Sequence, residues 1–195
     1  MVSMGKLRRF PLLETNRLIL RKMALSDVEF YFSHFNIREI VEGCCFPGPK
    51  SLEAAEEELE AYCIKPFEEN RGIRWGIIRK GSNQLIGTCG YYDWNKNARR
   101  AEIGYDLNPK YWGQGIMTEA LRAILKYSFE KMALNRVQAI IDSKNARSIG
   151  LVLGLGFKEE GVLRERSYFN GQFRDDVCFS LLKREWSEPQ EHRLE

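Results

Sequence analysis

Residues 105–120 (YDLNPKYWGQGIMTEA) join an apolar strand to an amphipathic helix through a loop with two glycines, and this junction limits the possible folds. The start of a helix leaves unpaired backbone N–H groups and the positive end of the helix dipole, which together bind phosphate oxygens. Gly113 and Gly115 remove side chains where a ligand approaches the backbone. The junction therefore predicts a phosphate-binding loop between a strand and a helix.

The helix after this loop has a regular apolar face, with buried-type residues recurring at intervals of three and four. They are Met117, Ala120, Leu121, Ile124, Leu125, Ser128 and Met132. A strand is predicted at 136–141, after the helix. Because a helix separates this strand from the one before the loop, we expect the two strands to be parallel.

The remaining pattern predicts an α/β sandwich with a mixed sheet, in a single domain over residues 12–186 with terminal extensions at 1–11 and 187–195. The further strands are expected at 16–22, 73–79, 84–93, 99–107, 162–169 and 172–182. Further helices are expected from a capping box at Ser26–Glu29, from Ser51 to a bend or end at Pro66, and from Asn145 to Gly154. A loop is expected at Cys44–Pro49 and a two-residue hairpin turn at Asn170-Gly171.

Composition excludes several classes of function. The 30 basic and 27 acidic residues give a net charge of +3 and are interleaved, so neither nucleic acid nor a membrane is an expected partner. Five cysteines without a C-x-x-C spacing predict reduced thiols in a cytoplasmic protein. His34 and His192 have no second ligand at metal spacing, so no metal site is expected.

Two common phosphate-binding loops do not match the sequence. A Walker loop needs Lys-Ser or Lys-Thr after its last glycine, but Ile116-Met117 follows Gly115. A dinucleotide-binding fingerprint needs a glycine where Thr118 stands, and it follows a different strand arrangement. Taken alone, the loop indicates a pyrophosphate ligand, with a nucleotide-binding domain as the weaker alternative.

Three segments together resemble the GNAT superfamily of acetyl-CoA-dependent N-acetyltransferases. They are AEIGYDLNPKYWGQGIMTEA (101–120), NARS (145–148) with LGFKEEG (155–161), and RERSYFNGQFRD (164–175). With LETNRLILR (13–21) they look like its RimJ/RimL branch, whose named members acetylate the N-termini of ribosomal proteins. The resemblance implies a GNAT fold: a mixed, mostly antiparallel sheet of about seven strands with about four helices, and a splayed parallel strand pair that holds acetyl-CoA.

The resemblance also assigns residues to the acetyl-CoA site. The pyrophosphate loop falls on residues 112–117, where Trp112 and Met117 depart from the common form. Thr118 either adds a hydroxyl to the diphosphate site or caps the helix that begins after the loop. Asn145 and Ser148 either contact CoA or cap the helix that begins at Asn145. The cofactor-binding residues that the resemblance implies are Tyr105, Leu107, Trp112, Gly113, Gln114, Gly115, Ile116, Met117, Thr118, Asn145 and Ser148.

The catalytic candidates are Glu102, Ser148 and Glu165. Many members of the superfamily carry a tyrosine as the general acid where this chain has Val152, so that role passes to Ser148 or to no residue. Glu102 is the first candidate for the base, and Glu165 the second. Each glutamate is equally suited to an ion pair with a neighbouring arginine.

The predicted function is acetyl transfer from acetyl-CoA to a primary amine. Neutralising a lysine at pH 7 costs about 4.6 kcal/mol, whereas an α-amine costs about 1.1 kcal/mol, which favours a protein N-terminus. A small-molecule amine (an antibiotic, polyamine or amino acid) and a non-catalytic CoA-binding module are the alternatives. A homodimer is compatible with the sequence.

Overall fold

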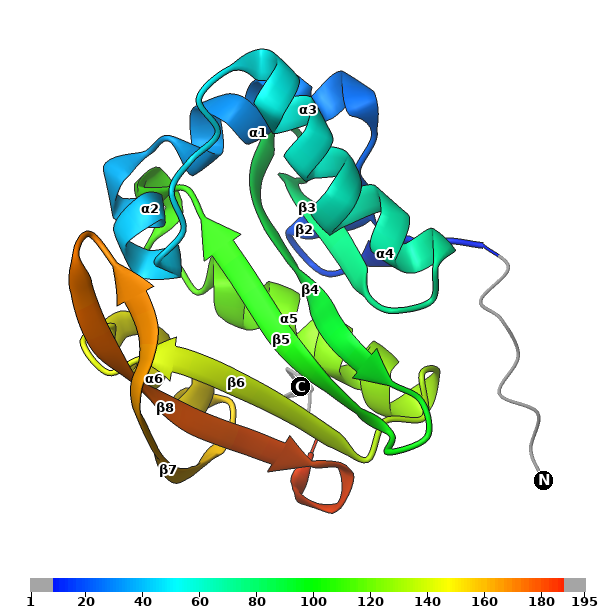
Figure 1. The fold of residues 1–195 in the computed structure, drawn as a ribbon. Coiled ribbons are helices and arrows are strands. Elements are labelled where there is room, and N and C mark those ends of the chain that lie inside the picture. Colours follow the sequence, from blue (N-terminus) through cyan, green and yellow to red (C-terminus); the bar gives the residue numbers. More distant parts are fainter. Residues whose placement is uncertain (1–8, 188–195) are drawn as a thin grey trace.

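The strands of the computed structural model, which describes residues 9–187, pair into one eight-stranded sheet (Figure 1). Across the sheet the strands are β1 (Leu13–Glu14), β2 (Leu18–Lys22), β3 (Ile73–Arg79), β4 (Leu85–Asn95), β5 (Arg100–Leu107), β6 (Arg136–Asp142), β8 (Gln172–Leu182) and β7 (Lys158–Phe169). Among the strands of residues 9–187, only β5 and β6 pair in parallel. This confirms the predicted mixed sheet. The strand beyond the expected seven is β1, whose two residues are too few for a periodic pattern.

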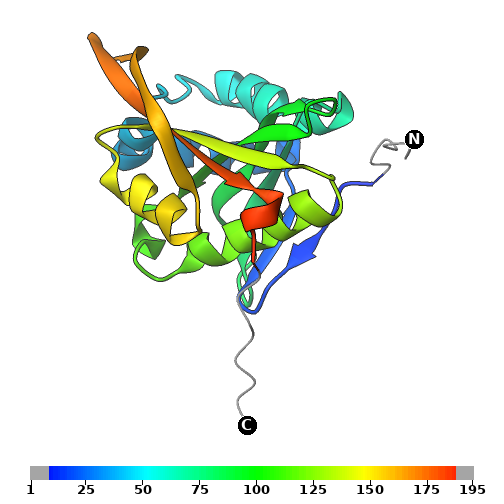
Figure 2. The same ribbon diagram turned by 90° about the horizontal axis from the view of Figure 1, so that it is seen from below.

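Helices cover both faces of the sheet, with α5 and α6 on one face and α1 to α4 on the other (Figures 1 and 2). They are α1 (Val28–Phe35), α2 (Arg38–Cys44), α3 (Leu52–Leu59), a π-helical turn (Glu60–Ile64), α4 (Lys65–Glu68), α5 (Ile116–Glu130) and α6 (Ala146–Gly154). Short 3₁₀ turns lie at Leu25–Asp27, Pro109–Tyr111 and Lys183–Glu185. The helix α2 was not predicted, because the sequence analysis places only a loop between α1 and α3.

The helix start at Ser26 differs from the prediction, and at Pro66, where a bend or an end is expected, the structure excludes the end. The expected capping box at Ser26 is wrong: a 3₁₀ turn contains this residue, and Asp27 accepts a hydrogen bond from the Ala24 N–H at 2.9 Å. Pro66 does not end its helical run, which continues to Glu68. Proline is tolerated there because it stands in the first turn of α4. The Ser51 cap is confirmed, since its hydroxyl accepts from the Ala54 N–H at 3.2 Å.

The predicted apolar face of α5 is buried against the sheet, together with Phe129. A second, smaller cluster lies under α1 and α3 on the other face and includes Tyr31 and Leu59. Before the first strand, Phe10 packs on Trp75, whose indole N–H donates to the Pro11 carbonyl at 2.8 Å. Residues 1–8 and 188–195, which include His192 and most of the expected extensions, lie outside the described residues.

The parallel strands β5 and β6 are joined only at their beginnings. Arg100–Glu102 pairs with Arg136–Gln138, and no pairing between β5 and β6 follows over the rest of β5. Meanwhile β5 stays paired with β4 up to Leu107, and β6 stays paired with β8 up to Asp142. The two strands therefore diverge inside a continuous sheet, which confirms the predicted splayed pair and creates an opening in the middle of the sheet.

Candidate active site

A cavity of about 1250 Å³ occupies the opening between β5 and β6. Its walls come from both strands, from the beginnings of α5 and α6, and from α1, α2 and the π-helical turn. Most of the residues proposed from sequence line it: Glu102, Tyr105, Leu107, Trp112, Gly113, Gly115, Ile116, Met117, Thr118, Asn145 and Ser148. Two proposed residues, Gln114 and Glu165, are not among the lining residues.

The glycine loop presents backbone rather than side chains to this cavity. Gly113 and Gly115 have φ angles of 72° and 70°, in the left-handed region that favours glycine. Gly115 is the N-cap of α5 and has no side-chain capping bond, so no capping side chain occupies the helix start. The side chains of Ile116 and Met117 are buried in the core, which leaves their amides as the groups they offer a ligand. Such an arrangement suits an anion.

A set of contacts that the sequence analysis missed fixes the loop in place. Glu119, in the first turn of α5, accepts from Arg17 Nε at 2.6 Å and from Thr15 Oγ1 at 2.5 Å. Arg17 also donates to the Gln114 carbonyl at 3.0 Å. Burial alone would raise the pKa of Glu119, but the hydrogen bonds from Thr15 and Arg17 outweigh burial and lower it. The loop is therefore tied to the turn between β1 and β2.

Trp112 closes one side of the loop. Its indole N–H donates to the Leu107 carbonyl at 2.7 Å, and the Arg147 guanidinium lies 3.6 Å from its ring centroid. The carbonyl at the end of β5 is thus occupied by Trp112. The stacked arginine brings a positive charge to the cavity where the loop and α6 meet.

Tyr105 and Ser148 meet inside the cavity, although they come from different elements. Their hydroxyl oxygens lie 2.6 Å apart, one on β5 and the other in the first turn of α6. Burial raises the pKa of Tyr105 to about 12, against the opposing effect of its hydrogen bond with Ser148. The sequence analysis names Tyr105 as a cofactor-binding residue without a role for its hydroxyl, so this side-chain contact with Ser148 is a new feature of the site.

Asn145 has a structural role that the capping alternative predicted. Its side-chain oxygen accepts from the Ser148 N–H at 3.0 Å, which caps α6. Its amide also donates to the Gly43 carbonyl of α2 at 3.1 Å. Asn145 therefore holds Ser148 in position and links the start of α6 to α2.

Glu102 stands at the last position where β5 pairs with β6, at the point where the two parallel strands separate. It is 6% exposed and lines the cavity. The Tyr92 hydroxyl donates to one carboxylate oxygen at 2.5 Å, and Gln138 Nε2 donates to the other at 3.0 Å. Burial and the charge of Glu102 both raise the pKa of Tyr92.

Glu165 lies elsewhere, in an irregular part of β7. It is exposed, has a φ of 52°, and its N–H donates to Asp175 Oδ1 at 2.8 Å. The neighbouring Ser167 does line the cavity and donates to Asp176 Oδ2 at 2.5 Å. Asp176 is thus a buried cavity carboxylate that the sequence analysis missed, and Arg166 holds it at 3.1 Å.

A buried polar cluster in the wall of the cavity is centred on Asp106, which the sequence analysis also left without a role. Its carboxylate lies 2.7 Å from His34 Nε2, and it accepts from Arg74 Nη2 and Thr88 Oγ1 at 2.5 Å each. Burial would raise the pKa of Asp106, but these contacts lower it to about 2. The cluster joins α1 to the strand that carries Tyr105.

Within residues 9–187, no three or more His, Cys, Asp or Glu side chains are grouped so as to hold a metal ion. No helix in this range is both long enough and apolar enough to cross a membrane.

Comparisons with known proteins agree on one family. Residues 17–158 match the acetyltransferase (GNAT) domain. The chain is 37% identical to the uncharacterized N-acetyltransferase YoaA of Bacillus subtilis, over 89% of this chain and 98% of that protein. It is 36% identical to the putative ribosomal N-acetyltransferase YdaF of the same organism, over 71% and 75% of the two chains.

A solved structure extends the likeness to the whole fold. The spermidine N-acetyltransferase of Vibrio cholerae, in complex with CoA and spermine, superposes with a TM-score of 0.78 at 25% identity, over 88% of this chain and 98% of that one. Taken with the splayed strands and the glycine loop, these matches show that the chain belongs to the GNAT family and is an N-acetyltransferase.

Proposed function

We propose that this N-acetyltransferase takes its acetyl group from acetyl-CoA and transfers it to the α-amine at the N-terminus of a polypeptide, as RimJ/RimL-type enzymes do. The observation that carries the proposal is the order of groups along one cavity. A helix start free of side-chain caps lies at one end, the Tyr105–Ser148 pair in the middle, and Glu102 beyond it.

The diphosphate of acetyl-CoA would lie on the loop at residues 113–117. The amides at the start of α5 donate to its oxygens, and the helix dipole adds to their attraction. Arg147, stacked on Trp112, and Lys144 supply positive charge at the same end of the cavity. The splayed edge of β5 then leads the pantetheine arm toward Ser148.

Ser148 would donate a hydrogen bond to the sulfur as the C–S bond breaks. The neutral amine nitrogen attacks the thioester carbon, the C–S bond breaks with its electron pair passing to sulfur, and the proton that nitrogen loses as the amide forms passes through solvent to the thiolate. Tyr105 has a pKa of about 12, well above the usual thiol value of about 8.5, so it does not give up its proton to the thiolate. Its hydrogen bond instead orients the Ser148 hydroxyl and increases its acidity. Tyr105 is therefore a positioning residue, and Ser148 touches the reacting atoms.

Glu102 would accept the proton of the incoming ammonium. Its two oxygens each receive one hydrogen bond, and a carboxylate oxygen can accept more than one. The cost of neutralising an α-amine is small at pH 7, about 1.1 kcal/mol, so a single carboxylate suffices. We do not assign Glu165 a part in the reaction, because it lies outside the cavity.

The charges in the cavity favour a peptide over a polyamine. A polyamine needs several carboxylates with no other cation, but arginines already pair with most of those that line the cavity. The pairs are Asp93–Arg100, Asp106–Arg74, Asp142–Arg174 and Asp176–Arg166. One amine followed by an uncharged backbone fits this pattern better than a chain of cations.

A panel of amines tests the proposal. Purified protein is incubated with acetyl-CoA and, separately, with short peptides, N-terminally blocked lysine peptides and spermidine, and the products are identified by mass spectrometry. We expect acetylation of the free α-amines with kcat/KM at least tenfold above the values for lysine side chains and spermidine. Preferred acetylation of spermidine would instead establish the small-molecule alternative, and no turnover on any amine would favour a CoA-binding module.

A further inference from the structure

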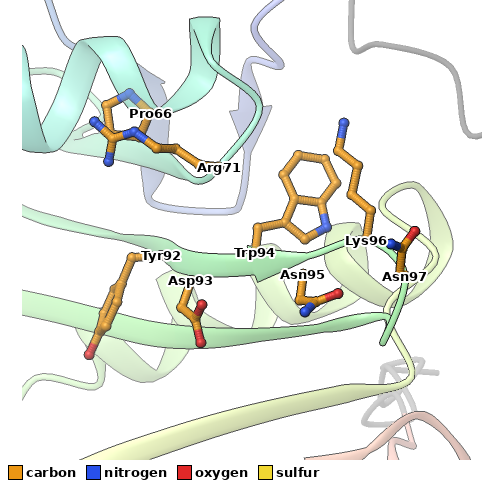
Figure 3. A pocket seen from close by; sticks show the side chains of 8 residues that line it. All are labelled: Pro66, Arg71, Tyr92, Asp93, Trp94, Asn95, Lys96 and Asn97. Carbon is orange, nitrogen blue, oxygen red and sulfur yellow. The ribbon is translucent and has the colours of Figure 1, made fainter.

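A second cleft, of about 530 Å³, opens beside the cavity at Tyr92 (Figure 3), whose hydroxyl donates to Glu102. It lies between the end of the α4 region and the last residues of β4 with the turn that follows. Its lining residues are Pro66, Arg71, Tyr92, Asp93, Trp94, Asn95, Lys96 and Asn97. Arg71, Tyr92 and Asp93 also line the cavity, so the two spaces share a wall.

The wall between them is a β-bulge. The pairing of β4 with β5 shifts between Tyr92 and Asn95, and Asp93 has a φ of 48°. Side chains two residues apart normally point to the same face of a strand. Because of the bulge, Trp94 rises toward Pro66 and Arg71, whereas Tyr92 and Asp93 point the other way (Figure 3). Tyr92 thus reaches Glu102 in the cavity, and Trp94 becomes a wall of the second cleft.

Hydrogen bonds across the cleft hold its two sides together. The Trp94 N–H donates to the Arg71 carbonyl at 3.0 Å. At the outer end, Lys96 Nζ donates to Asn70 Oδ1 at 3.1 Å and lies 4.6 Å from the ring centroid of Trp94. The indole N–H of Trp94 is buried and has no hydrogen-bond acceptor among the described residues.

The charged side chains of the cleft differ in whether they form ion pairs. Its one carboxylate, Asp93, is held by Arg100 at 2.7 Å, and Arg71 pairs with Glu69. The Lys96 ammonium contacts two neutral groups, the Asn70 amide and the Trp94 ring. Within residues 9–187 no carboxylate forms an ion pair with Lys96, so its ammonium can pair with an acidic group of a ligand.

We propose that this cleft binds the residues of the polypeptide acceptor that follow the acetylated one, with Trp94 contacting their backbone and Lys96 favouring an acidic side chain. The inference rests on the proposed function, because only an acceptor with a chain beyond its amine would extend from Glu102 past Tyr92. The cleft would lie on the opposite side of Glu102 from the CoA loop. It would select acceptors by the amino-acid sequence that follows their N-terminal residue.

Steady-state kinetics with saturating acetyl-CoA test the cleft directly. The substrates are alanine amide and neutral alanine-initiated peptides of two, four and six residues, and then hexapeptides in which one glutamate or one lysine is moved through positions 2 to 5. We expect KM to fall with length up to about four residues. At one position, we expect glutamate to be preferred over lysine by about threefold, the usual effect of one exposed ion pair.

Two variants locate the effect, and a third serves as control. Lys96→Glu changes an accessible side chain and should abolish or invert the preference for glutamate. Trp94→Ala should raise KM for the hexapeptide about tenfold, with less than a twofold change for alanine amide and for acetyl-CoA. Lys183→Glu makes the same charge change on an exposed residue after β8. It should alter neither the preference for glutamate nor the KM for the hexapeptide.

The outcomes separate this inference from the proposed function. If peptides are acetylated but KM is independent of their length, or if Lys96→Glu leaves the glutamate preference intact, the cleft has no such role and the proposed function stands. If no peptide is acetylated while other amines are, both proposals are overturned.

Discussion

His34 Nε2 lies 2.7 Å from Asp106 Oδ1, and this contact joins the first helix to the strand that forms one side of the active site. Both side chains are almost fully buried, and Arg74 and Thr88 complete the hydrogen bonding of the carboxylate. Asp106 follows Tyr105 directly in β5. The position of β5 under α1 therefore depends on a buried charge whose partners come from α1, β3 and β4.

Removing this carboxylate should destabilise the protein strongly. Asp106→Ala leaves Arg74 without its partner, and breaking a buried pair in this way costs about 3–5 kcal/mol. Urea unfolding at pH 7 measures the loss. Glu42→Ala, which breaks the exposed Arg38–Glu42 pair, should cost less than about 1 kcal/mol. Equal effects of the two changes would mean that the buried cluster contributes no more than a surface pair.

The same carboxylate predicts a loss of stability in acid. The pKa of Asp106 is about 2 in the folded protein and about 3.9 in an unfolded chain, so the folded state holds the proton less tightly. The stabilisation is therefore complete above about pH 4 and disappears as the pH falls toward 2. Urea midpoints from pH 7 to pH 3 should fall more steeply for the wild type than for Asp106→Asn. Parallel curves would show that other carboxylates account for the acid sensitivity.

The sequence predicts those parts of the fold that have a local pattern. The apolar face of α5, the strands with alternating residues and the Asn170-Gly171 turn are readable because each is set within a few residues. The contacts of the site are different. Tyr105 and Ser148 are 43 residues apart, and His34 and Asp106 are 72 apart. Neither pair has a signal in the local periodicity, because the splay of β5 and β6 and the packing of α1 bring them together.

Tyr105→Phe tests the positioning role of that hydroxyl. The change removes the hydrogen bond to Ser148 but keeps the ring, so kcat should fall about tenfold while KM for acetyl-CoA stays within twofold. Ser148→Ala should lower kcat further, within the range of about 10²–10³ seen when a donor to a developing charge is removed. The double variant should be no slower than Ser148→Ala alone, because Tyr105 acts through Ser148. Additive losses would show that Tyr105 acts on the substrate independently.

Glu102→Gln tests the assignment of the base, and its pH dependence distinguishes proton removal from a structural role. Glutamine keeps the shape of the side chain and can still accept from Tyr92, but it cannot take a proton from an ammonium. At pH 7 we expect kcat/KM for a peptide to fall about 10²–10⁴-fold, the usual contribution of general acid–base catalysis. Near pH 9 most of an α-amine with a pKa of about 7.8 is already neutral, so the deficit of the variant should shrink by about sixfold, which is the 1.1 kcal/mol that neutralising the amine costs at pH 7. Glu165→Gln, the other glutamate proposed from the sequence, should behave like the wild type at every pH, since its side chain is exposed outside the cavity. A deficit in Glu102→Gln that stays constant from pH 7 to pH 9 would mean that Glu102 orders Tyr92 and Gln138 rather than accepting a proton.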